Sequence, residues 1–180
     1  MAQTLTYQPA EDSWLLASVV QKFSKDKKVL DMGTGSGIQA RTAQAAGAQS
    51  VLAVDINKQA LKKVKEQGIP TLHSNLFAKM KDKFNLIICN PPYLPEDAQE
   101  DTESAQATTG GKHGDEFILT FLKQAPKNLT KDGEILLLLS SLTPQAKINQ
   151  LLKKQNMSKK TIATKKLFME QLEVWRIRQR

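Results

Sequence analysis

A short apolar strand that runs into a glycine-rich turn and then a helix constrains this sequence more than any other feature. Residues 28–33 (Lys-Val-Leu-Asp-Met-Gly) predict the strand, and the turn at residues 33–37 (Gly-Thr-Gly-Ser-Gly) leads into a helix that begins at Ile38. A strand, a glycine turn and a helix in this order begin a doubly wound α/β fold, in which ligands bind at the carboxyl ends of parallel strands. We therefore expect a mostly parallel sheet with a nucleotide-type ligand at this turn.

The glycine spacing and one acidic residue indicate which kind of ligand binds. A dinucleotide-binding fingerprint has glycine at its first, third and sixth positions; Gly33 and Gly35 fill the first two, but Ile38 occupies the sixth. Asp31 lies two residues before the first glycine, where a carboxylate would repel a pyrophosphate. A sulfonium cofactor with an amino-acid tail carries a cationic amine, which a carboxylate can bind. The turn therefore favours a cofactor of the S-adenosylmethionine type.

The next two strands supply further candidates at the same edge of the sheet. Residues 51–56 predict the second strand, and Asp55 near its carboxyl end follows the aspartate of the first strand by 24 residues, one strand–helix–strand unit. An acidic side chain there can hold two ribose hydroxyls, in NAD or in S-adenosylmethionine. Residues 71–74 predict a third strand that leads to Asn75 and Leu76, near the expected adenine edge.

An asparagine between a buried strand and two prolines predicts the substrate site. Residues 84–89 are mostly aliphatic, as in a strand buried on both faces of a parallel sheet, and Asn90, Pro91, Pro92 and Tyr93 follow. The prolines restrict the backbone and leave the asparagine at the carboxyl end of the strand. The carboxamide oxygen of Asn90 and the carbonyl of Pro91 offer two acceptors for a planar NH2 group, and Tyr93 can pack on its flat face. The alternative is a turn that only ends a strand.

The amino-terminal segment has two interpretations. Residues 9–13 (Pro-Ala-Glu-Asp-Ser) lie at the start of a helix predicted over residues 7–23. A proline near the first turn with acidic residues after it is typical of an ordinary helix start. The functional interpretation is that this segment folds over a cofactor and that Ser13 supplies a hydroxyl to its polar end.

The remaining periodic segments predict the elements that complete the sheet and its helical layers. Further helices are expected over residues 38–46, 58–67, 115–129 and 144–155, the second of them capped by Asn57 and ended by Gly68. A buried strand is expected over residues 134–140 after a turn, and an antiparallel pair over residues 161–168 and 172–178, joined by a polar turn, closes the sheet.

Composition narrows the class of protein. A chain of 180 residues with 40% hydrophobic residues predicts one domain over residues 1–180. No apolar run is long enough for a membrane span, and the amino terminus has no basic region followed by an apolar stretch, so we expect a cytoplasmic protein. Cys89 is the only cysteine, which excludes a disulfide framework and a cysteine zinc site within the chain, and no metal is expected.

The charge distribution bears on the substrate. The net charge is +8 and the isoelectric point is about 9.5, which attracts nucleic acid or ribonucleoprotein. However, a cluster of acidic residues follows Tyr93 and would line the mouth of the active site. Carboxylates there repel phosphate, so we do not expect specific binding of nucleic acid. These acidic residues are Glu96, Asp97, Glu100, Asp101 and Glu103.

Together, these motifs resemble a known family. Y-Q-P-A-E-D-S, D-M-G-T-G-S-G, the aspartate at position 55, N-P-P-Y and G-G-K-H-G (residues 110–114) are similar to the motifs of the HemK/PrmC-type protein-glutamine N5-methyltransferases. The closer similarity is to the short archaeal and eukaryotic branch, which lacks the amino-terminal release-factor-binding domain of the bacterial enzymes.

The resemblance implies a fold, a cofactor and a substrate. The fold is that of a class I, Rossmann-like methyltransferase with a mostly parallel seven-stranded sheet and an antiparallel C-terminal strand. The cofactor is S-adenosylmethionine, and the substrate is the G-G-Q glutamine of a class I peptide chain release factor. A small zinc-binding activator subunit is an implied partner, with a docking surface around the second and third strands.

The resemblance also assigns the site residues. Residues 90–93 would bind the glutamine amide, and Asn90 would also border the cofactor. Relatives often have aspartate where this chain has Asn75, so we expect an altered cofactor affinity rather than its loss. The implied cofactor contacts are Ser13, Asp31, Gly33 and Gly35 at the methionine end, Asp55 at the ribose, and Asn75 and Leu76 at the adenine.

Three alternatives stay open at this point. A nucleic-acid amino-methyltransferase that acts on adenine or guanine shares N-P-P-Y and suits the basic isoelectric point. A protein lysine methyltransferase is the second, although an amide-binding N-P-P-Y suits lysine poorly. The third is a binding module of the same fold without activity, against which the intact cofactor and substrate motifs argue.

Overall fold

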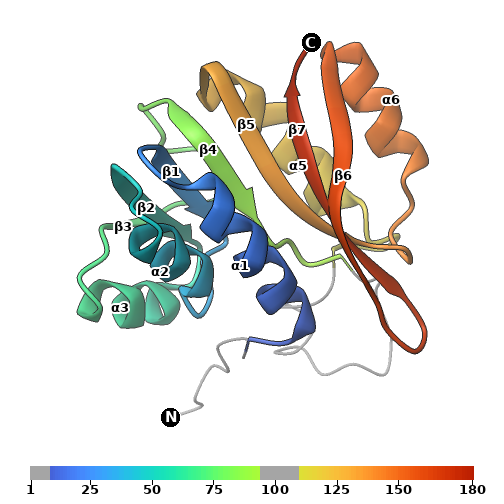
Figure 1. Cartoon of the computed structure of the whole chain (residues 1–180). Helices are drawn as coiled ribbons and strands as arrows, with labels where there is room; N and C mark the ends of the chain where they lie inside the picture. Colours follow the sequence, from blue (N-terminus) through green and yellow to red (C-terminus); the bar gives the residue numbers. More distant parts are fainter. Residues whose placement is uncertain (1–8, 94–109) are drawn as a thin grey trace.

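Seven strands form one sheet in the order β3-β2-β1-β4-β5-β7-β6, in a computed structural model that describes residues 9–93 and 110–180 (Figure 1). Strands β1 to β5 run parallel, whereas β7 runs antiparallel to both of its neighbours, β5 and β6. The predicted α/β fold with a mostly parallel seven-stranded sheet and an antiparallel C-terminal strand is therefore confirmed. The strands are β1 (Lys28–Met32), β2 (Ser50–Asp55), β3 (Thr71–His73), β4 (Phe84–Cys89), β5 (Leu129–Ser140), β6 (Met157–Lys166) and β7 (Gln171–Gln179).

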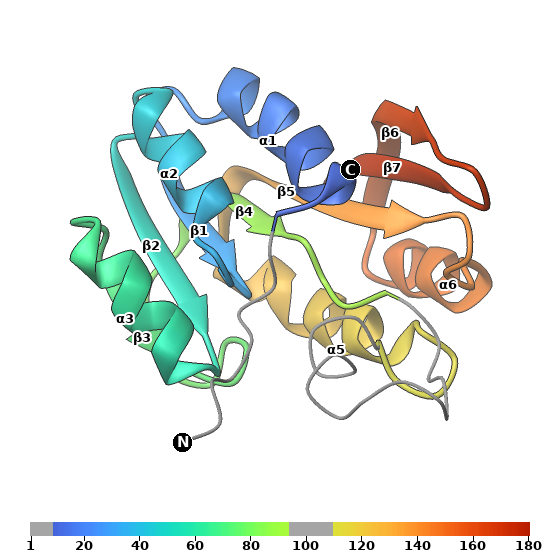
Figure 2. The ribbon, with the colours of Figure 1, turned by 90° about the horizontal axis from the view of Figure 1, so that it is seen from below.

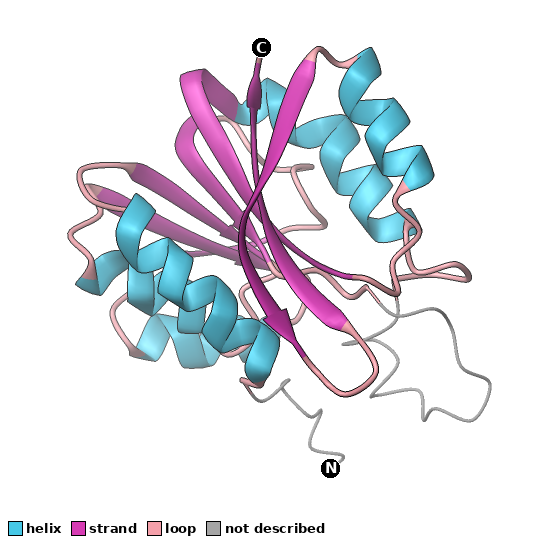
Figure 3. Cartoon of the chain, turned by 45° about the vertical axis from the view of Figure 1, so that its right-hand side comes forward, coloured by secondary structure: helices cyan, strands magenta, loops and turns pink. Residues whose placement is uncertain are grey.

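Helices cover both faces of this sheet, as Figures 2 and 3 show. Helices α1, α2 and α3 contribute to one hydrophobic core cluster, and helices α5 and α6 contribute to a second cluster on the opposite face. The helices are α1 (Glu11–Phe23), α2 (Ile38–Ala45), α3 (Lys58–Glu66), α5 (Glu116–Gln124) and α6 (Ala146–Lys154).

Both faces of the central strands are buried, which explains why their sequences are continuous apolar runs. In β4, Leu86 and Ile88 belong to the core cluster with α1, α2 and α3, while Ile87 and Cys89 belong to the cluster with α5 and α6. Successive side chains of a strand point to opposite faces, so a strand covered on both sides needs apolar residues at every position. The predicted bounds of this strand agree with the structure.

One predicted helix is too long at its carboxyl end. The helix expected over residues 115–129 ends as α5 at Gln124, and a short 3-10 helix (η1, Ala125–Asn128) follows it. Pro126 lies in the first turn of η1, and because it has no backbone N–H it cannot continue the hydrogen bonding of α5. The apolar periodicity continues past this proline, which is why the pattern alone extended the helix.

Two predicted turns also differ from the structure. The turn expected before Glu134 is an irregularity inside β5, which already begins at Leu129. The turn between β6 and β7 is not polar, because Phe168 and Met169 lie at its centre and are 99% and 77% exposed. Strand β6 also begins at Met157, earlier than predicted.

Some predictions fall on residues that the structure does not describe. The acidic cluster at residues 96–103 and the first residues of the helix predicted over residues 7–23 lie outside the described residues. In the described ranges, no helix is both long and apolar enough to cross a membrane.

Ion pairs around Glu134 join several elements near the amino ends of the parallel strands. The Glu134 side chain is 4% exposed and its carboxylate contacts Lys27 Nζ at 2.6 Å and Arg176 Nε at 2.5 Å. Lys27 precedes β1 and Arg176 lies in β7, and both cations also lie over the ring of Phe23 at the end of α1. The network therefore ties α1, β1, β5 and β7 together at the end of the sheet opposite the carboxyl ends.

Replacing Glu134 with alanine should destabilise the fold, because two cations lose their shared carboxylate. Breaking a buried ion pair costs about 3–5 kcal/mol, but both cations are partly exposed, so we expect about 2 kcal/mol. Urea unfolding of Glu134→Ala and wild type measures this difference, with Asp82→Ala as the control, because the Asp82–Lys28 pair is exposed. Equal unfolding midpoints for Glu134→Ala and wild type would contradict the structural role of the network.

Candidate active site

The predicted site residues gather at the carboxyl ends of the parallel strands. Asp31 is the second-last residue of β1, Asp55 ends β2, and Asn90 directly follows β4. Asn75 is exposed and Leu76 is half-buried just after β3, which pairs with β2. From β1 the chain continues to β2 and β3 on one side and returns to β4 on the other, so these residues flank the point where the strand order reverses. Open α/β sheets bind ligands at such a point.

The glycine turn after β1 leaves open space at this edge. Gly33 has φ +74° and Gly35 has φ +49°, a left-handed backbone that favours glycine. A Cβ atom at Gly33 would meet nothing within 4 Å, and one at Gly35 would touch only the carbonyl of Gly33. In contrast, a Cβ atom at Gly37 would lie 2.7 Å from Val64 Cγ2, so that glycine permits close packing of α2 and α3. The first two glycines therefore leave room for a ligand, and the third serves the fold.

Asp31 is a buried carboxylate directly beneath this turn. It is 1% exposed, and its Oδ2 accepts hydrogen bonds from Thr34 Oγ1 at 2.6 Å and from the backbone N–H of Ala40 at 3.1 Å. Burial raises the pKa of Asp31 from its ordinary 3.8 to about 6, although these two hydrogen bonds act in the opposite direction and nearby Asp55 adds to the rise. Such a carboxylate is poorly compensated within the chain and suits a cationic ligand group.

Asp55 joins the end of β2 to the glycine turn. Its Oδ2 accepts the backbone N–H of Gly35 at 2.9 Å, and its Oδ1 accepts the backbone N–H of Asn57 at 2.8 Å. Each carboxylate oxygen can accept more than one hydrogen bond, so hydroxyl donors can still bind. Asn57 in turn caps α3, as predicted, by accepting from the N–H groups of Gln59 and Ala60.

The side chain of Asn90 is fixed by Asp12, a residue that sequence reasoning did not assign to the site. Asn90 Nδ2 donates to Asp12 Oδ2 at 3.0 Å, and the Tyr93 hydroxyl lies 3.5 Å from the same oxygen. Asp12 is 4% exposed and also accepts from the backbone N–H and the hydroxyl of Ser13. A carboxylate accepts only, so it orients the amide with Nδ2 toward Asp12 and Oδ1 away from it. Within the described part of the chain, Oδ1 of Asn90 is buried and has no hydrogen-bond partner.

Two segments from the second half of the chain, around Gly110 and Thr143, pack against the Asn90–Tyr93 segment. Thr143 Oγ1 donates to the carbonyl of Tyr93 at 3.3 Å. Gly110 packs so closely that a Cβ atom there would lie 2.7 Å from the carbonyl oxygen of Pro92. The turn that follows Gly110 is held by Glu116, whose carboxylate accepts the backbone N–H of His113 at 3.1 Å. The G-G-K-H-G segment thus belongs to the substrate side of the site.

Comparison with known proteins agrees with this geometry. Residues 10–169 match the family model described as "Methyltransferase small domain". A Methanocaldococcus jannaschii protein that carries the name of a protein N5-glutamine methyltransferase is 36% identical over 95% of this chain and 92% of its own length.

The chain belongs to the methyltransferase small domain family.

Two further similarities refine this assignment. The release factor glutamine methyltransferase of Deinococcus radiodurans is 32% identical over 76% of this chain, which spans 54% of that longer protein. The solved E. cuniculi Mtq2–Trm112 complex, described as responsible for the methylation of the eRF1 translation termination factor, shares the fold with a TM-score of 0.79 at 20% identity. That similarity covers 97% of this chain and 98% of the other. The two relatives, at 36% and 32% identity, confirm the resemblance of this methyltransferase to the protein-glutamine N5 family, and the solved complex shows that the fold is shared.

Ser13 differs in part from its expected environment in this methyltransferase. It is 2% exposed, its hydroxyl donates to Asp12 Oδ1 at 3.2 Å, and its carbonyl accepts Gln39 Nε2 at 3.0 Å. These contacts hold the start of α1 against α2, next to the glycine turn. Its hydroxyl contact with the methionine end of a cofactor stays a prediction, as do the individual roles of the other predicted residues.

Ile56 is a further residue at this edge that the sequence did not single out. The strand predicted over residues 51–56 ends at Asp55, so Ile56 lies outside β2 and is 66% exposed. An apolar side chain beside Asp55 could pack against a flat ring of a ligand.

The raised pKa of Asp31 predicts how this methyltransferase responds to pH. A carboxyl whose pKa rises on folding costs stability as it ionises, so the cost should appear between about pH 4 and about pH 6 and persist above that range. Asp31→Asn removes the charge and keeps an acceptor, so it should be more stable than wild type at pH 7.5, by on the order of 2 kcal/mol, with the difference shrinking toward pH 4. Urea unfolding at several pH values tests this; a stability difference independent of pH would contradict it.

Proposed function

We propose that this methyltransferase transfers a methyl group from S-adenosylmethionine to the side-chain amide nitrogen of a glutamine in a peptide chain release factor. The observation that carries this proposal is the buried Oδ1 of Asn90, which is oriented by Asp12 and has no hydrogen-bond partner within the described residues. An acceptor held in this way matches the N–H of a planar primary amide.

The cofactor assignment is supported by residues at the carboxyl ends of β1, β2 and β3, on the opposite side of the site from Asn90. Asp31 would hold the cationic amine of the methionine end, the open space at Gly33 and Gly35 would admit the cofactor close to the backbone, and Asp55 would accept ribose hydroxyls. Asn75, Leu76 and Ile56, which follow the carboxyl ends of β3 and β2, would border the adenine. When bound, S-adenosylmethionine supplies an electrophilic methyl group on a sulfonium sulfur.

The chemistry that this chain supplies is the orientation of a weak nucleophile. An amide nitrogen reacts poorly because its lone pair is delocalised into the carbonyl. Hydrogen bonds from the NH2 group to Asn90 Oδ1 and to the Pro91 carbonyl would orient the nitrogen and stabilise the positive charge that develops on it. Orientation alone contributes several kcal/mol, within the roughly 7–11 kcal/mol available to well-aligned reactants. No strong base is needed before transfer, because the proton leaves from a cationic nitrogen.

The protein substrate is favoured by the two sequence relatives described above, which carry the names of a protein N5-glutamine methyltransferase and a release factor glutamine methyltransferase. The test is transfer of labelled methyl from S-adenosylmethionine to purified release factor, DNA and RNA in parallel, with and without the activator subunit. Label on the release factor that disappears when its G-G-Q glutamine is replaced supports the proposal. Label on DNA or RNA alone would refute it and favour the alternative function, methylation of an amino group of adenine or guanine.

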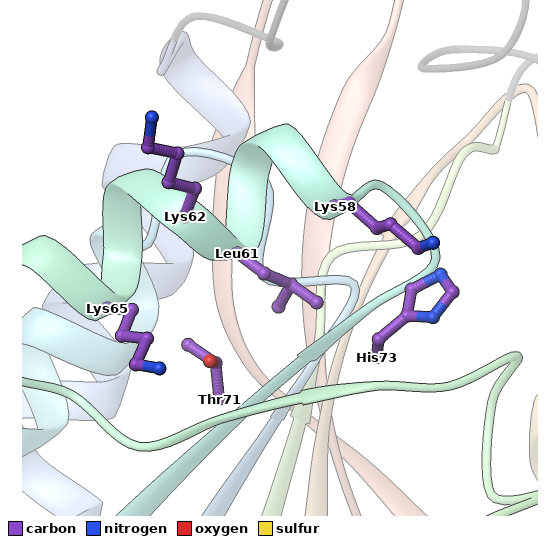
Figure 4. A pocket seen from close by; sticks show the side chains of 6 residues that line it. All are labelled: Lys58, Leu61, Lys62, Lys65, Thr71 and His73. Atoms are coloured by element: carbon purple, nitrogen blue, oxygen red, sulfur yellow. The ribbon is translucent and has the colours of Figure 1, made fainter.

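We also propose that a small activator subunit docks beside β3, as the described composition of the Mtq2–Trm112 complex suggests. Strand β3 pairs only with β2 among the described strands, so its other side is open to an added strand. A pocket of about 290 Å³ lies between this strand and α3 (Figure 4). Most of its lining surface is apolar carbon, to which the stems of three lysines contribute, and the lysine charges suit a partner with acidic residues. The lining residues are Lys58, Leu61, Lys62, Lys65, Thr71 and His73.

Asn90 variants should separate catalysis from cofactor binding. Asn90→Ala removes the oriented acceptor, so methylation of the release factor should fall about a hundredfold or more, while calorimetry shows nearly unchanged affinity for S-adenosylmethionine. Asn90→Asp should be at least as inactive, because its carboxylate would face the carboxylate of Asp12 at hydrogen-bond distance.

Asn85→Ala is the matched control for these variants. Asn85 lies in β4, at the end opposite to Asn90, where it accepts the backbone N–H of Lys28 and donates to the hydroxyl of Thr130. We expect this variant to keep its turnover. Near-normal turnover of Asn90→Ala would show that Asn90 only ends the strand.

A further inference from the structure

Large exposed hydrophobic residues are concentrated at the active-site edge of the molecule. Within the described residues, five such side chains are exposed, and each belongs to a segment at the carboxyl ends of the parallel strands or at the start of α1. In Figure 1 the turn of the β6–β7 hairpin also lies at this lower edge of the sheet, toward which β4 ends and where α1 begins. The five residues are Trp14, Ile56, Leu142, Phe168 and Met169.

The hairpin turn carries the two most exposed of these residues without a structural need for them. The backbone N–H of Leu167 donates to the carbonyl of Glu170 at 2.8 Å, so Phe168 and Met169 are the central residues of the turn. Hairpin turns favour glycine, asparagine and aspartate at these positions. Since Phe168 is 99% exposed and Met169 is 77% exposed, core packing does not account for them either. Neighbouring exposed apolar side chains of this kind are typical of an interaction site.

The hairpin turn is connected to the substrate site by a continuous set of contacts. Glu170 accepts a hydrogen bond from the Ser140 hydroxyl, and the backbone N–H of Ser141 donates to Gln171 at 2.8 Å. The same segment after β5 continues to Thr143, which donates to the carbonyl of Tyr93. The turn is therefore held in a defined position relative to the Asn90–Tyr93 segment.

A second attachment fixes the hairpin from the other side. Lys165 of β6 pairs with Glu11 at the start of α1, one residue before the Asp12 that orients Asn90. The hairpin is thus tied to both segments that build the substrate site.

We propose that Leu142, Phe168 and Met169, which we name the hairpin rim, are the docking surface for the protein domain that carries the glutamine to be methylated. This inference rests on the proposed function. A glutamine side chain is short, so the domain that presents it to Asn90 has to lie against the residues around the site. Phenylalanine and methionine are enriched in the cores of protein–protein interfaces, where a few side chains dominate the affinity.

The test is the double variant Phe168→Ser/Met169→Ser, assayed with purified release factor. Its kcat/KM should fall about tenfold or more through a higher KM, with kcat unchanged, because binding remote from the reacting atoms is lost equally in the ground and transition states. Affinity for S-adenosylmethionine and thermal stability should match wild type, since both side chains are exposed. Phe168→Leu/Met169→Leu, which keeps the apolar surface, should retain most of the wild-type kcat/KM.

Several results would contradict a docking role of the hairpin rim. One is a kcat/KM of the serine variant within about twofold of the wild-type value, and another is a loss confined to kcat or to cofactor affinity. Gel filtration that shows a wild-type dimer dissociated by the serine variant would assign the rim to self-association instead. If the wild type methylates no release factor, the proposed function fails and the inference fails with it; if the wild type is active and the serine variant equals it, only the inference fails.

Discussion

The hydrogen bond between the Asp12 carboxylate and the Asn90 amide is the contact on which the active site depends. It joins the first turn of α1 to the end of β4, segments that lie 78 residues apart in the sequence. An isolated asparagine amide can turn either way, but a neighbouring carboxylate accepts only from its nitrogen and so directs the oxygen toward the substrate. The packing of α1 on the sheet, through the buried residues Leu16, Val19 and Val20, holds this carboxylate in place.

The site consists of two halves with different electrostatic requirements, and the fold separates them at the reversal of strand order. Asp31 is buried near the end of β1, where its raised pKa shows that the chain alone does not compensate its charge. Retaining such a group lowers stability at neutral pH, and the proposed role toward a cationic ligand would make this a trade between stability and function. On the other half, Asn90 to Tyr93 present hydrogen-bond acceptors and an aromatic ring, which suit a neutral amide. The hairpin rim then extends the substrate half outward over the edge of the sheet.

Local patterns predicted those parts of the structure whose causes are local. The apolar run of β4 stops at two prolines, and the cap at Asn57 needs only the two N–H groups that follow it, so these features were visible in the sequence. Asp12 was missed because an acidic residue in the first turn of a helix already has a local explanation, and its partner is distant in sequence. The apolar turn at Phe168 and Met169 was not predicted either, because hairpin turns are usually polar. The reason for apolar residues there lies outside the turn itself, in the surface to which they belong. Pattern therefore recovered the strands, although it placed the starts of β5 and β6 too late, and it could not show which side chains meet across them.

The most direct measurement is a double-mutant cycle on Asp12 and Asn90, with kcat for methylation of the release factor and affinity for S-adenosylmethionine determined for Asp12→Ala, Asn90→Ala and the double variant. If Asp12 acts by orienting Asn90, Asp12→Ala should lower kcat about tenfold or more in the wild-type background and should have almost no further effect once Asn90 is alanine. An equal loss of kcat from Asp12→Ala in both backgrounds would show that the two residues act independently and would contradict the account.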